Sequence, residues 1–581
     1  MTIRRIERLH NEPVQLSPTR SAFLSPGRAL CGIRAALLAF AFLSPLVAGP
    51  SVTVWQQLVS WICLAGWLLC APALARPASE LTRWLGASAA VLVLAGTWGA
   101  AGGALASALA ALVAIALAAG LGASSADGDV STPKAIAWGL FSAGLLNAVL
   151  GLLQYYHLAG DLASWFASPP EGRAWGTLRQ RNQFATLLGL ALVALLWLYG
   201  IQSARRARWG LVAAAVVLIA AAAASLSRTG LLQFLLVMAI AGFAAWRERH
   251  GRVIPASFRL PPPLVLLAGI PLYFAFDALL PYLAAGGDGQ VATAALRSRL
   301  QPTVVATDSR VVLWQNVLTL IAQRPLTGWG WGELSFAHFA TLYTGPRFPV
   351  ILDNAHNLPL HLAVELGIPV ALLICGGFLW MVGAAKPWRE RDPLRLMAWG
   401  LLGVILLHSL LEYPLWYGPF QLVFGLCLGV LWPASTQRPA ANGSRKLATF
   451  AAAAWIAVIG YAAWDYTRIS QIYLPREARL PAYRDDTLAK LQGSWLFSRQ
   501  VDFAEVTLTA VTPANAAHMH ELAGRVLHFS PEPRVIMKLI ESAELLGRDA
   551  EAHALATRFR VAFPAAFARW LDNRPDDAPE L

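Results

Sequence analysis

Apolar runs long enough to cross a lipid bilayer recur along this chain and limit its fold more than any other feature. They begin near residue 32 and end near residue 464, so they cover about three quarters of the 581 residues. A run of roughly 18 or more apolar residues, as an α-helix, crosses about 30 Å of hydrocarbon. Because a bilayer offers no hydrogen-bond partners to the backbone, such runs form helices. The sequence therefore predicts an all-α polytopic membrane protein.

The composition agrees with this fold class, since 57% of the residues are hydrophobic and only 14% are charged. We expect about 13 transmembrane helices in a transmembrane domain over residues 32–464. The predicted spans are 32–49, 54–75, 84–100, 103–122, 135–156, 182–202, 209–225, 229–246, 262–285, 356–384, 394–412, 415–433 and 447–464.

Basic residues gather in short clusters between these runs and predict the orientation of the chain. The clusters are an arginine-bearing N-terminal arm, residues 1–31, and the segments "SARRARW", "RERHGRV", "KPWRERDPLR" and "QRPAANGSRK". If the arm is cytoplasmic, every cluster falls on the cytoplasmic side, as the positive-inside rule requires. The net charge of +13 is thus explained by topology, and no nucleic-acid partner is expected.

Two polar regions are predicted on the opposite, outer side of the membrane. One is a large loop, residues 286–355, and the other is the C-terminal region, residues 465–581. Apolar residues at helical spacing predict that the C-terminal region is a small helical domain. Its segment "IESAELLGRDAEAHALATRF" is typical of a single tetratricopeptide-like helix pair. The alternative is a domain that serves only solubility.

Two arginines on the outer side of the membrane are the first candidates for chemistry. Arg228 lies in "SLSRTG", a turn between two apolar spans with almost no loop. Arginine near hydrocarbon usually lines a wet cavity or meets an anion. Arg310 lies in the large loop, near the start of a short amphipathic helix that Asp308 or Ser309 can cap and that ends before Pro325. Either arginine can be an ordinary solvated charge, but together they could grip a diphosphate.

The segment "DNAHNLPLHLAVELG" supplies the second group of candidates. Asn357, His361 and Glu365 follow one another at spacings of four, which places them on one face of a helix, with His356 just ahead. Lipid offers no partners to such a stripe, so it must face protein or water, and we expect it to line a cavity. The alternative for His361 and Glu365 is hydrogen bonding between helices. Asp353 or Asn354 is the expected N-cap.

These residue types favour a transfer reaction with a diphosphate leaving group. Two arginines can stabilise the charge that develops on a diphosphate. His356 can accept the proton of an acceptor hydroxyl as general base. No acidic cluster suited to Mg²⁺ accompanies them, and none of the five cysteines has a partner at metal-ligand spacing, so neither a metal nor a cofactor is expected. Glycosyl transfer from a polyprenyl diphosphate sugar fits this pattern.

Several motifs resemble one family. "AHNLPLHLAVELGIPVALL" and "SRVVLWQNVLTLIAQRPLTGWGWGEL" resemble signature segments of the O-antigen ligase/polymerase superfamily. "LHSLLEYPLWY" and "GTLRQRNQFATLLGL" are similar to segments of the bacterial protein O-oligosaccharyltransferases of the PglL type. The tail "DYTRISQIYLPREAR" resembles the extension beside that transferase domain.

The resemblance implies a metal-independent, inverting glycosyltransferase in the bacterial inner membrane with its active site facing the periplasm. The donor would be a glycan on undecaprenyl diphosphate, and the acceptor Ser or Thr of a periplasmic protein such as pilin. Carried over by motif, the essential histidine falls on His356 and the essential arginines on Arg228 and Arg310. Gln180, Asn182 and Gln183 fall on a region that helps to position the substrates, as we expect Asn357, His361 and Glu365 to do.

Three other functions remain open at this stage. The nearest is an O-antigen ligase, which uses the same chemistry with lipid A-core as the acceptor. A polymerase that extends the glycan itself is the next. A membrane transporter is the alternative from another class, because polar residues inside a membrane also mark transport pathways. The candidate residues lie toward the periplasmic face rather than the bilayer midplane, which argues against a transporter.

Overall fold

We analysed a computed structural model of the chain. It describes residues 26–44, 52–71, 74–96, 102–127, 129, 131–160, 174–250, 258–284, 304–434 and 442–573. Most of the expected N-terminal arm, residues 1–25, and the part of the large loop before residue 304 lie outside the described residues. The described residues form helices and contain no β-strand, which confirms the all-α prediction.

Helices occupy each of the thirteen predicted spans. They are α1 (Pro26–Leu43), α2 (Val52–Cys70), α3 (Ser79–Ala95), α4 (Gly102–Ala123), α5 (Ser131–Tyr155), α6 (Arg181–Ile201), α7 (Arg205–Ala224), α8 (Arg228–His250), α9 (Pro263–Leu267) with α10 (Gly269–Ala284), α15 (Ile368–Ala371) with α16 (Gly377–Ala385), α17 (Pro393–Ser409), α18 (Gly418–Leu431) and α19 (Asn442–Ser470). Over the described ranges, nine helices are long and apolar enough to cross a membrane, and α17 and α18 are shorter apolar helices. The chain is therefore a polytopic membrane protein, while the count of 13 spans stays a prediction.

One predicted span is not a single helix. The expected helix over 356–384 is broken at Gly367, which separates α14 (Leu358–Leu366) from α15. Gly367 has φ 87°, a left-handed conformation that favours glycine, and a Cβ at this position would collide with the carbonyl oxygen of Leu326. The close approach of the large loop at this point explains the break, and α14 is left as a separate nine-residue helix.

Close helix packing holds the membrane part together. The helix α6 is buried along most of its length, in contact with α5, α8 and α17. The helices α4 and α18 meet through glycines, because a Cβ on Gly122, Gly425 or Gly429 would collide with backbone carbonyls of the partner helix. Small residues at such contacts let backbones approach closely, which is a common way to pair helices in membranes. The ends of these tightly packed helices can therefore hold side chains in fixed positions.

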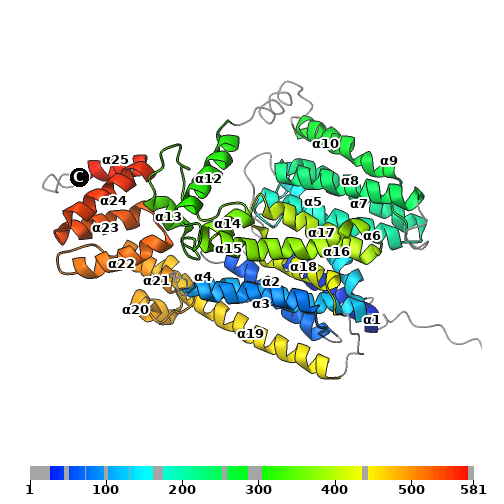
Figure 1. Ribbon diagram of the computed structural model, residues 1–581, viewed down its shortest axis with the longest axis horizontal. Helices are drawn as coiled ribbons and strands as arrows, with labels where there is room; N and C mark the ends of the chain where they lie inside the picture. Colours follow the sequence, from blue (N-terminus) through cyan, green and yellow to red (C-terminus); the bar gives the residue numbers. More distant parts are fainter. Residues whose placement is uncertain are drawn as a thin grey trace, which may run out of the picture.

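The described parts of the large loop, residues 304–355, and of the C-terminal region, residues 465–573, lie at one end of the bundle (Figure 1). The loop forms α12 (Val304–Gln323) and α13 (Leu334–Ala340) ahead of α14. The C-terminal region continues from α19 into α20 (Thr487–Leu491), α21 (Ser498–Leu508), α22 (Ala516–Phe529), α23 (Pro533–Leu545), α24 (Asp549–Ala562) and α25 (Pro564–Asp572). Phe339 of the loop is part of the hydrophobic core of α21–α25, so the two regions pack together.

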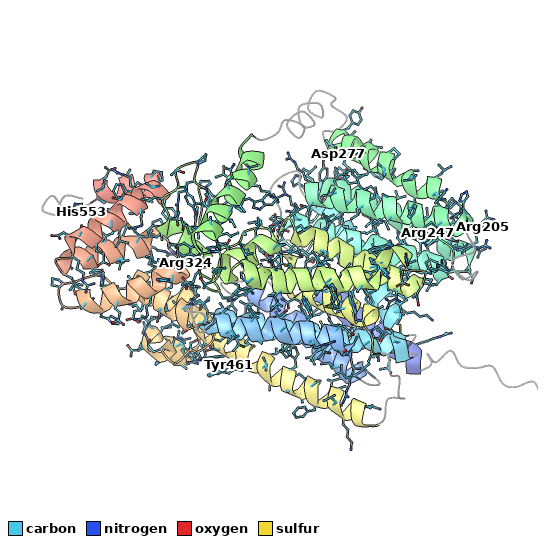
Figure 2. All side chains as sticks on the ribbon, in the orientation of Figure 1. Arg205, Arg247, Asp277, Arg324, Tyr461 and His553 are labelled. Carbon is cyan, nitrogen blue, oxygen red and sulfur yellow. The ribbon has the colours of Figure 1, made fainter. Side chains whose placement is uncertain are left out.

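The helix pair expected near the C-terminus is present. The helices α23 and α24 pack against each other around a turn at Gly547, which has φ 69°. The domain limits and the tetratricopeptide-like class stay predictions. At the other end of the molecule lie Arg205 and Arg247, which belong to two of the basic clusters, far from Arg324 of the large loop (Figure 2). These two basic clusters and the C-terminal helices thus lie at opposite ends of the described structure (Figures 1 and 2).

Candidate active site

Glu412, in the turn between α17 and η5 (Pro414–Trp416), joins side chains from three distant parts of the chain. Its Oε2 lies 2.8 Å from Nδ1 of His356. Its Oε1 accepts hydrogen bonds from Nη2 of Arg310 at 2.8 Å and from Nδ2 of Asn182 at 3.0 Å. Only 8% of the Glu412 side chain is exposed, so this carboxylate forms the buried centre of the site. We call Glu412 and its three partners the Glu412 cluster.

The contact with Glu412 sets the orientation of the His356 ring. A carboxylate only accepts hydrogen bonds, so Nδ1 of His356 carries the hydrogen and Nε2 of the neutral ring keeps its lone pair. The backbone of His356 has φ 50°, and its N–H donates to Oδ1 of Asn354 at 2.9 Å. The side chain remains 28% exposed. The geometry therefore leaves the lone pair on Nε2 of His356 available as a base, on a partly exposed ring whose Nδ1 is hydrogen-bonded to Glu412.

Arg310 reaches the cluster from α12. The expectation that Asp308 or Ser309 caps this helix is wrong, because α12 already begins at Val304 and contains both positions. The helix ends at Gln323, before Pro325, as predicted. Arg310 is 37% exposed while one of its nitrogens contacts Glu412, so its guanidinium still has donors that face solvent.

Arg228 is linked to the cluster through its neighbour in the sequence. The hydroxyl of Ser227 donates to Oδ1 of Asn182 at 2.7 Å, while Nδ2 of the same Asn182 donates to Glu412. Arg228 is the first residue of α8 and is exposed, at the end of the turn in which the sequence predicted it. The backbone that carries Arg228 is thus held next to Asn182, and the three predicted catalytic residues gather at one end of the bundle.

Backbone strain is concentrated around this cluster. Three of the six non-glycine residues described with positive φ are Arg179, Leu226 and His356, which lie beside Gln180, Ser227 and Asn357 respectively. Such conformations cost roughly 1–3 kcal/mol each and persist only where the surrounding structure imposes them. Arg179 and His356 lie in or beside segments that contact Glu412 directly, and Leu226 lies beside Ser227, which reaches Glu412 through Asn182. Such clustering is typical of a functional site.

The two predicted glutamines have different positions. Gln180 is the N-cap of α6, since its side chain accepts from the backbone N–H of Gln183 at 2.6 Å. Gln183 is buried and forms a side-chain hydrogen bond with Tyr417, which also contacts Tyr413. The Tyr413 ring in turn lies 5.1 Å from the His356 ring. Gln183 is therefore connected to His356 through Tyr417 and Tyr413, while Gln180 fixes the start of α6.

Asn357 is the N-cap of α14, so the expectation of a cap at Asp353 or Asn354 is wrong. Its Oδ1 accepts from the backbone N–H of Leu360, and its Nδ2 donates to the carbonyl of Leu410 at 2.9 Å. The cap falls later than predicted because Asn354 instead supports the left-handed turn at His356. Asn357 thus ties the start of α14 to the end of α17, where Glu412 follows.

His361 and Glu365 face packed protein, so the expectation that they line an open cavity is wrong. His361 is 3% and Glu365 is 2% exposed, and their side chains lie 3.5 Å apart. His361 meets the rings of Trp331 and Trp416 edge to face. Glu365 accepts backbone hydrogen bonds from Gly332 and Leu334 of the large loop. The pair therefore fixes the large loop against α14, and a role in substrate binding stays a prediction.

The charges in the cluster keep the Glu412 carboxylate ionised. Burial alone raises the pKa of this carboxyl, but the hydrogen bond from His356 and the positive charge of Arg310 outweigh burial and hold the pKa below its ordinary value. An ionised Glu412 can stabilise a positive charge on His356 after it takes up a proton. Among the described residues, no three His, Cys, Asp or Glu side chains are grouped so as to hold a metal ion.

Glu412 is the candidate site residue that the sequence interpretation missed. It lies within the motif "LHSLLEYPLWY", at the last residue of the predicted span 394–412 and beyond the end of α17 at Ser409. An ionisable residue at the end of such a span is a functional candidate by the same reasoning that selected Arg228. Its partners are separated from it by 56, 102 and 230 residues, so no local spacing connects them.

Three protein-family profiles match the chain in adjoining segments. Residues 174–199 match a family described as protein glycosylation ligase. Residues 213–375 match a family described as O-antigen ligase. Residues 396–575 match the C-terminal part of a virulence factor membrane-bound polymerase. The first two profiles cover Asn182, Arg228, Arg310 and His356, and the third covers Glu412.

Two curated relatives from Acinetobacter baylyi are also similar to the chain. A general O-oligosaccharyltransferase is 26% identical over 306 residues, which are 50% of this chain and 49% of the relative. A ComP-specific O-oligosaccharyltransferase is 24% identical over 173 residues, or 28% of this chain and 31% of the relative. The matches thus span about half and about a third of these relatives. They confirm the resemblance to PglL-type protein O-oligosaccharyltransferases within the O-antigen ligase superfamily.

Proposed function

We propose that this chain, a membrane protein similar to the O-oligosaccharyltransferases, transfers a glycan from a polyprenyl diphosphate to Ser or Thr hydroxyls of proteins outside the cytoplasm. The donor lipid would be undecaprenyl diphosphate, and pilin is a candidate acceptor. The enzyme would lie in the bacterial inner membrane with the Glu412 cluster facing the periplasm. The observation that carries the proposal is the single carboxylate, Glu412, that contacts both His356 and Arg310.

The proposed reaction is a direct displacement at the anomeric carbon. Nε2 of His356 takes the proton of the acceptor hydroxyl as its oxygen bonds to the anomeric carbon. The bond from that carbon to the diphosphate oxygen breaks at the same time, so the configuration inverts. The diphosphate leaves with its bonding electrons, and the guanidiniums of Arg228 and Arg310 stabilise the charge that develops on it. Glu412 holds the Nδ1 hydrogen and stabilises the imidazolium.

Transfer with purified components tests the proposal. The full-length protein in lipid nanodiscs is mixed with the lipid-linked glycan and with a periplasmic acceptor protein, and mass spectrometry measures the glycan on Ser or Thr. We expect transfer to continue in excess EDTA, because arginines rather than a metal would neutralise the diphosphate. A product on lipid A-core alone, or no product from an intact donor, would contradict the proposal.

A second acceptor is supported by one comparison. The match to the O-antigen ligase family covers Arg228, Arg310 and His356, and the same residues could transfer the glycan to lipid A-core. The chemistry at the anomeric carbon would be unchanged, because both acceptors supply a hydroxyl. Rough lipopolysaccharide added in competition with the protein acceptor distinguishes the two, since only the preferred acceptor should be glycosylated at low donor concentration.

A further inference from the structure

A cavity of about 450 Å³ lies outside the Glu412 cluster, between the large loop and the helices α21 and α22. Its walls combine charged and aromatic side chains, among them Arg324, Trp329 and Glu333 of the loop and Arg499, Asp502 and Arg525 of the two helices. The volume falls in the usual range for small-ligand sites, roughly 300–1,000 Å³.

Buried ion pairs hold the floor of this cavity. Glu333 is 5% exposed, accepts a hydrogen bond from Nδ1 of His528 at 2.7 Å, and lies 3.6 Å from Nη2 of Arg499. Above this floor, the Asp502 and Arg525 side chains are only 3.9 Å apart and remain 30% and 51% exposed. The exposed Arg324 lies 4.2 Å over the ring of the half-buried Trp329. Hydrogen-bond donors, hydrogen-bond acceptors and an aromatic surface thus line one cavity.

A row of aromatic rings runs from His356 to the loop that forms one wall of the cavity. Tyr413 lies 5.1 Å from the His356 ring, Trp416 lies 6.4 Å from Tyr413, and Trp331 stacks on Trp416 at 6.4 Å. All three rings are half-buried, so part of each remains accessible. Trp331 lies between Trp329 and Glu333 in the sequence, and both of these residues line the cavity. One short loop therefore borders both the aromatic row and the cavity.

We propose that this cavity is a subsite for the distal sugars of the transferred glycan, reached from His356 along the aromatic row. This inference rests on the proposed function. A sugar ring has hydroxyl groups that both donate and accept hydrogen bonds, and it has apolar C–H faces. Arg324, Asp502 and Arg525 supply the matching polar groups, while Tyr413, Trp416 and Trp331 supply surfaces for stacking. The glycan would extend from the reacting anomeric carbon over these rings into the cavity.

The shape and charge of the cavity favour a saccharide over the acceptor protein. A folded acceptor would need a larger exposed surface, since specific protein interfaces bury about 800 Å² on each partner. An anionic peptide would need several unpaired cations, whereas Arg499 faces Glu333 and Arg525 faces Asp502 and Glu521, which leaves Arg324, over the Trp329 ring, as the lining arginine that faces no carboxylate among the described residues. Neutral hydroxyl groups can bond to such paired side chains without separating the charges.

Donors of two lengths test the subsite. One is the polyprenyl diphosphate that carries the complete glycan of the host, and the other is the same lipid with only the reducing-end sugar. The ratio of kcat/KM for the complete donor to that for the single-sugar donor is measured for wild type, Asp502→Asn and Arg324→Gln in nanodiscs. The matched control is Asp485→Asn, which removes an exposed carboxylate paired with Arg476 outside the cavity.

We expect the ratio to fall about tenfold in Asp502→Asn and Arg324→Gln, through a higher KM for the complete donor, and to stay at the wild-type value in Asp485→Asn. An unchanged ratio, or a higher KM for the acceptor protein instead of the donor, would overturn the subsite.

Direct binding separates this inference from the proposed function. The free oligosaccharide, released by mild acid from the host's lipid-linked glycan, is added to the full-length protein and followed by saturation-transfer NMR. Binding to wild type that is weakened in Asp502→Asn supports the subsite even if no transfer to protein is found. Failure of wild type to bind this oligosaccharide would reject it.

Discussion

The Glu412 cluster and the floor of the cavity share a glutamate, a histidine and an arginine but differ in their surroundings. In each, a buried glutamate contacts one histidine and faces one arginine. His356 and Arg310 each lie 2.8 Å from Glu412, whereas His528 and Arg499 lie 2.7 and 3.6 Å from Glu333. Glu412 connects the membrane helices to the large loop, and Glu333 connects the large loop to the C-terminal helices.

The surroundings of the two histidines differ. The His528 ring stacks on Phe336, with centroids 3.7 Å apart, and its backbone is part of α22. The His356 ring meets Tyr413 edge to face, and its backbone lies in the left-handed region at φ 50°. Beyond Glu412, Asn182 and Ser227 continue the polar chain toward Arg228. A glutamate–histidine–arginine contact is thus insufficient to indicate catalysis, and the strained backbone and extended polar network distinguish the two sites.

The largest expected difference between the two sites concerns the histidines. We expect His356→Ala to lower transfer about 10²- to 10⁴-fold without loss of donor binding, because it removes the base and leaves the arginines. Glu412→Gln should lower transfer over a similar range, since a glutamine can stabilise the wrong tautomer of His356. His528→Ala should lower transfer less than about tenfold. Single-turnover transfer and donor binding are measured for all three variants. Equal losses of transfer in His356→Ala and His528→Ala would show that the two sites do not differ in catalysis.

The next largest difference is expected between the turnover of arginine variants in the Glu412 cluster and its surroundings and that of an arginine variant at the cavity floor. Arg228→Lys and Arg310→Lys keep the charge but lose the planar fork that matches a phosphate, so each should lower turnover about 10- to 100-fold with normal protein levels in the membrane. Arg499→Lys, at the floor of the cavity, should leave turnover on the single-sugar donor within about threefold of wild type. If the lysine variants of Arg228 and Arg310 have wild-type turnover, these residues do not contact the diphosphate.

The third expected effect is on stability rather than on turnover and falls on Glu333. Glu333→Gln removes the carboxylate between His528 and Arg499, which should weaken the attachment of the C-terminal helices by about 1–3 kcal/mol. Limited proteolysis of the protein in nanodiscs should then release this region faster than from wild type. Asp485→Asn, at an exposed ion pair, is the matched control with little expected change. Unchanged proteolysis of Glu333→Gln would show that packing around Phe339 alone holds the two regions together.

Much of the fold could be predicted because its signals are local. Runs of apolar residues located the helices, and the turn before Arg228 fell where it was expected. The break at Gly367 could not be predicted from hydropathy, because both halves of the run are apolar. It depends on the approach of the large loop, whose backbone N–H groups at Trp329 and Gly330 donate to the carbonyls of Val364 and Glu365 at the end of α14.

The sequence by itself determined an all-α membrane protein, the turn that carries Arg228, and His356 as the candidate base. These conclusions follow from bilayer thickness, the cost of charge near hydrocarbon and the chemistry of imidazole, which depend on residue type and near neighbours. Only the tertiary structure decided that Glu412 is the shared partner of His356, Arg310 and Asn182, and that His361 and Glu365 are buried. Packing of helices that are distant in the sequence sets those contacts, so no spacing along the chain contains them.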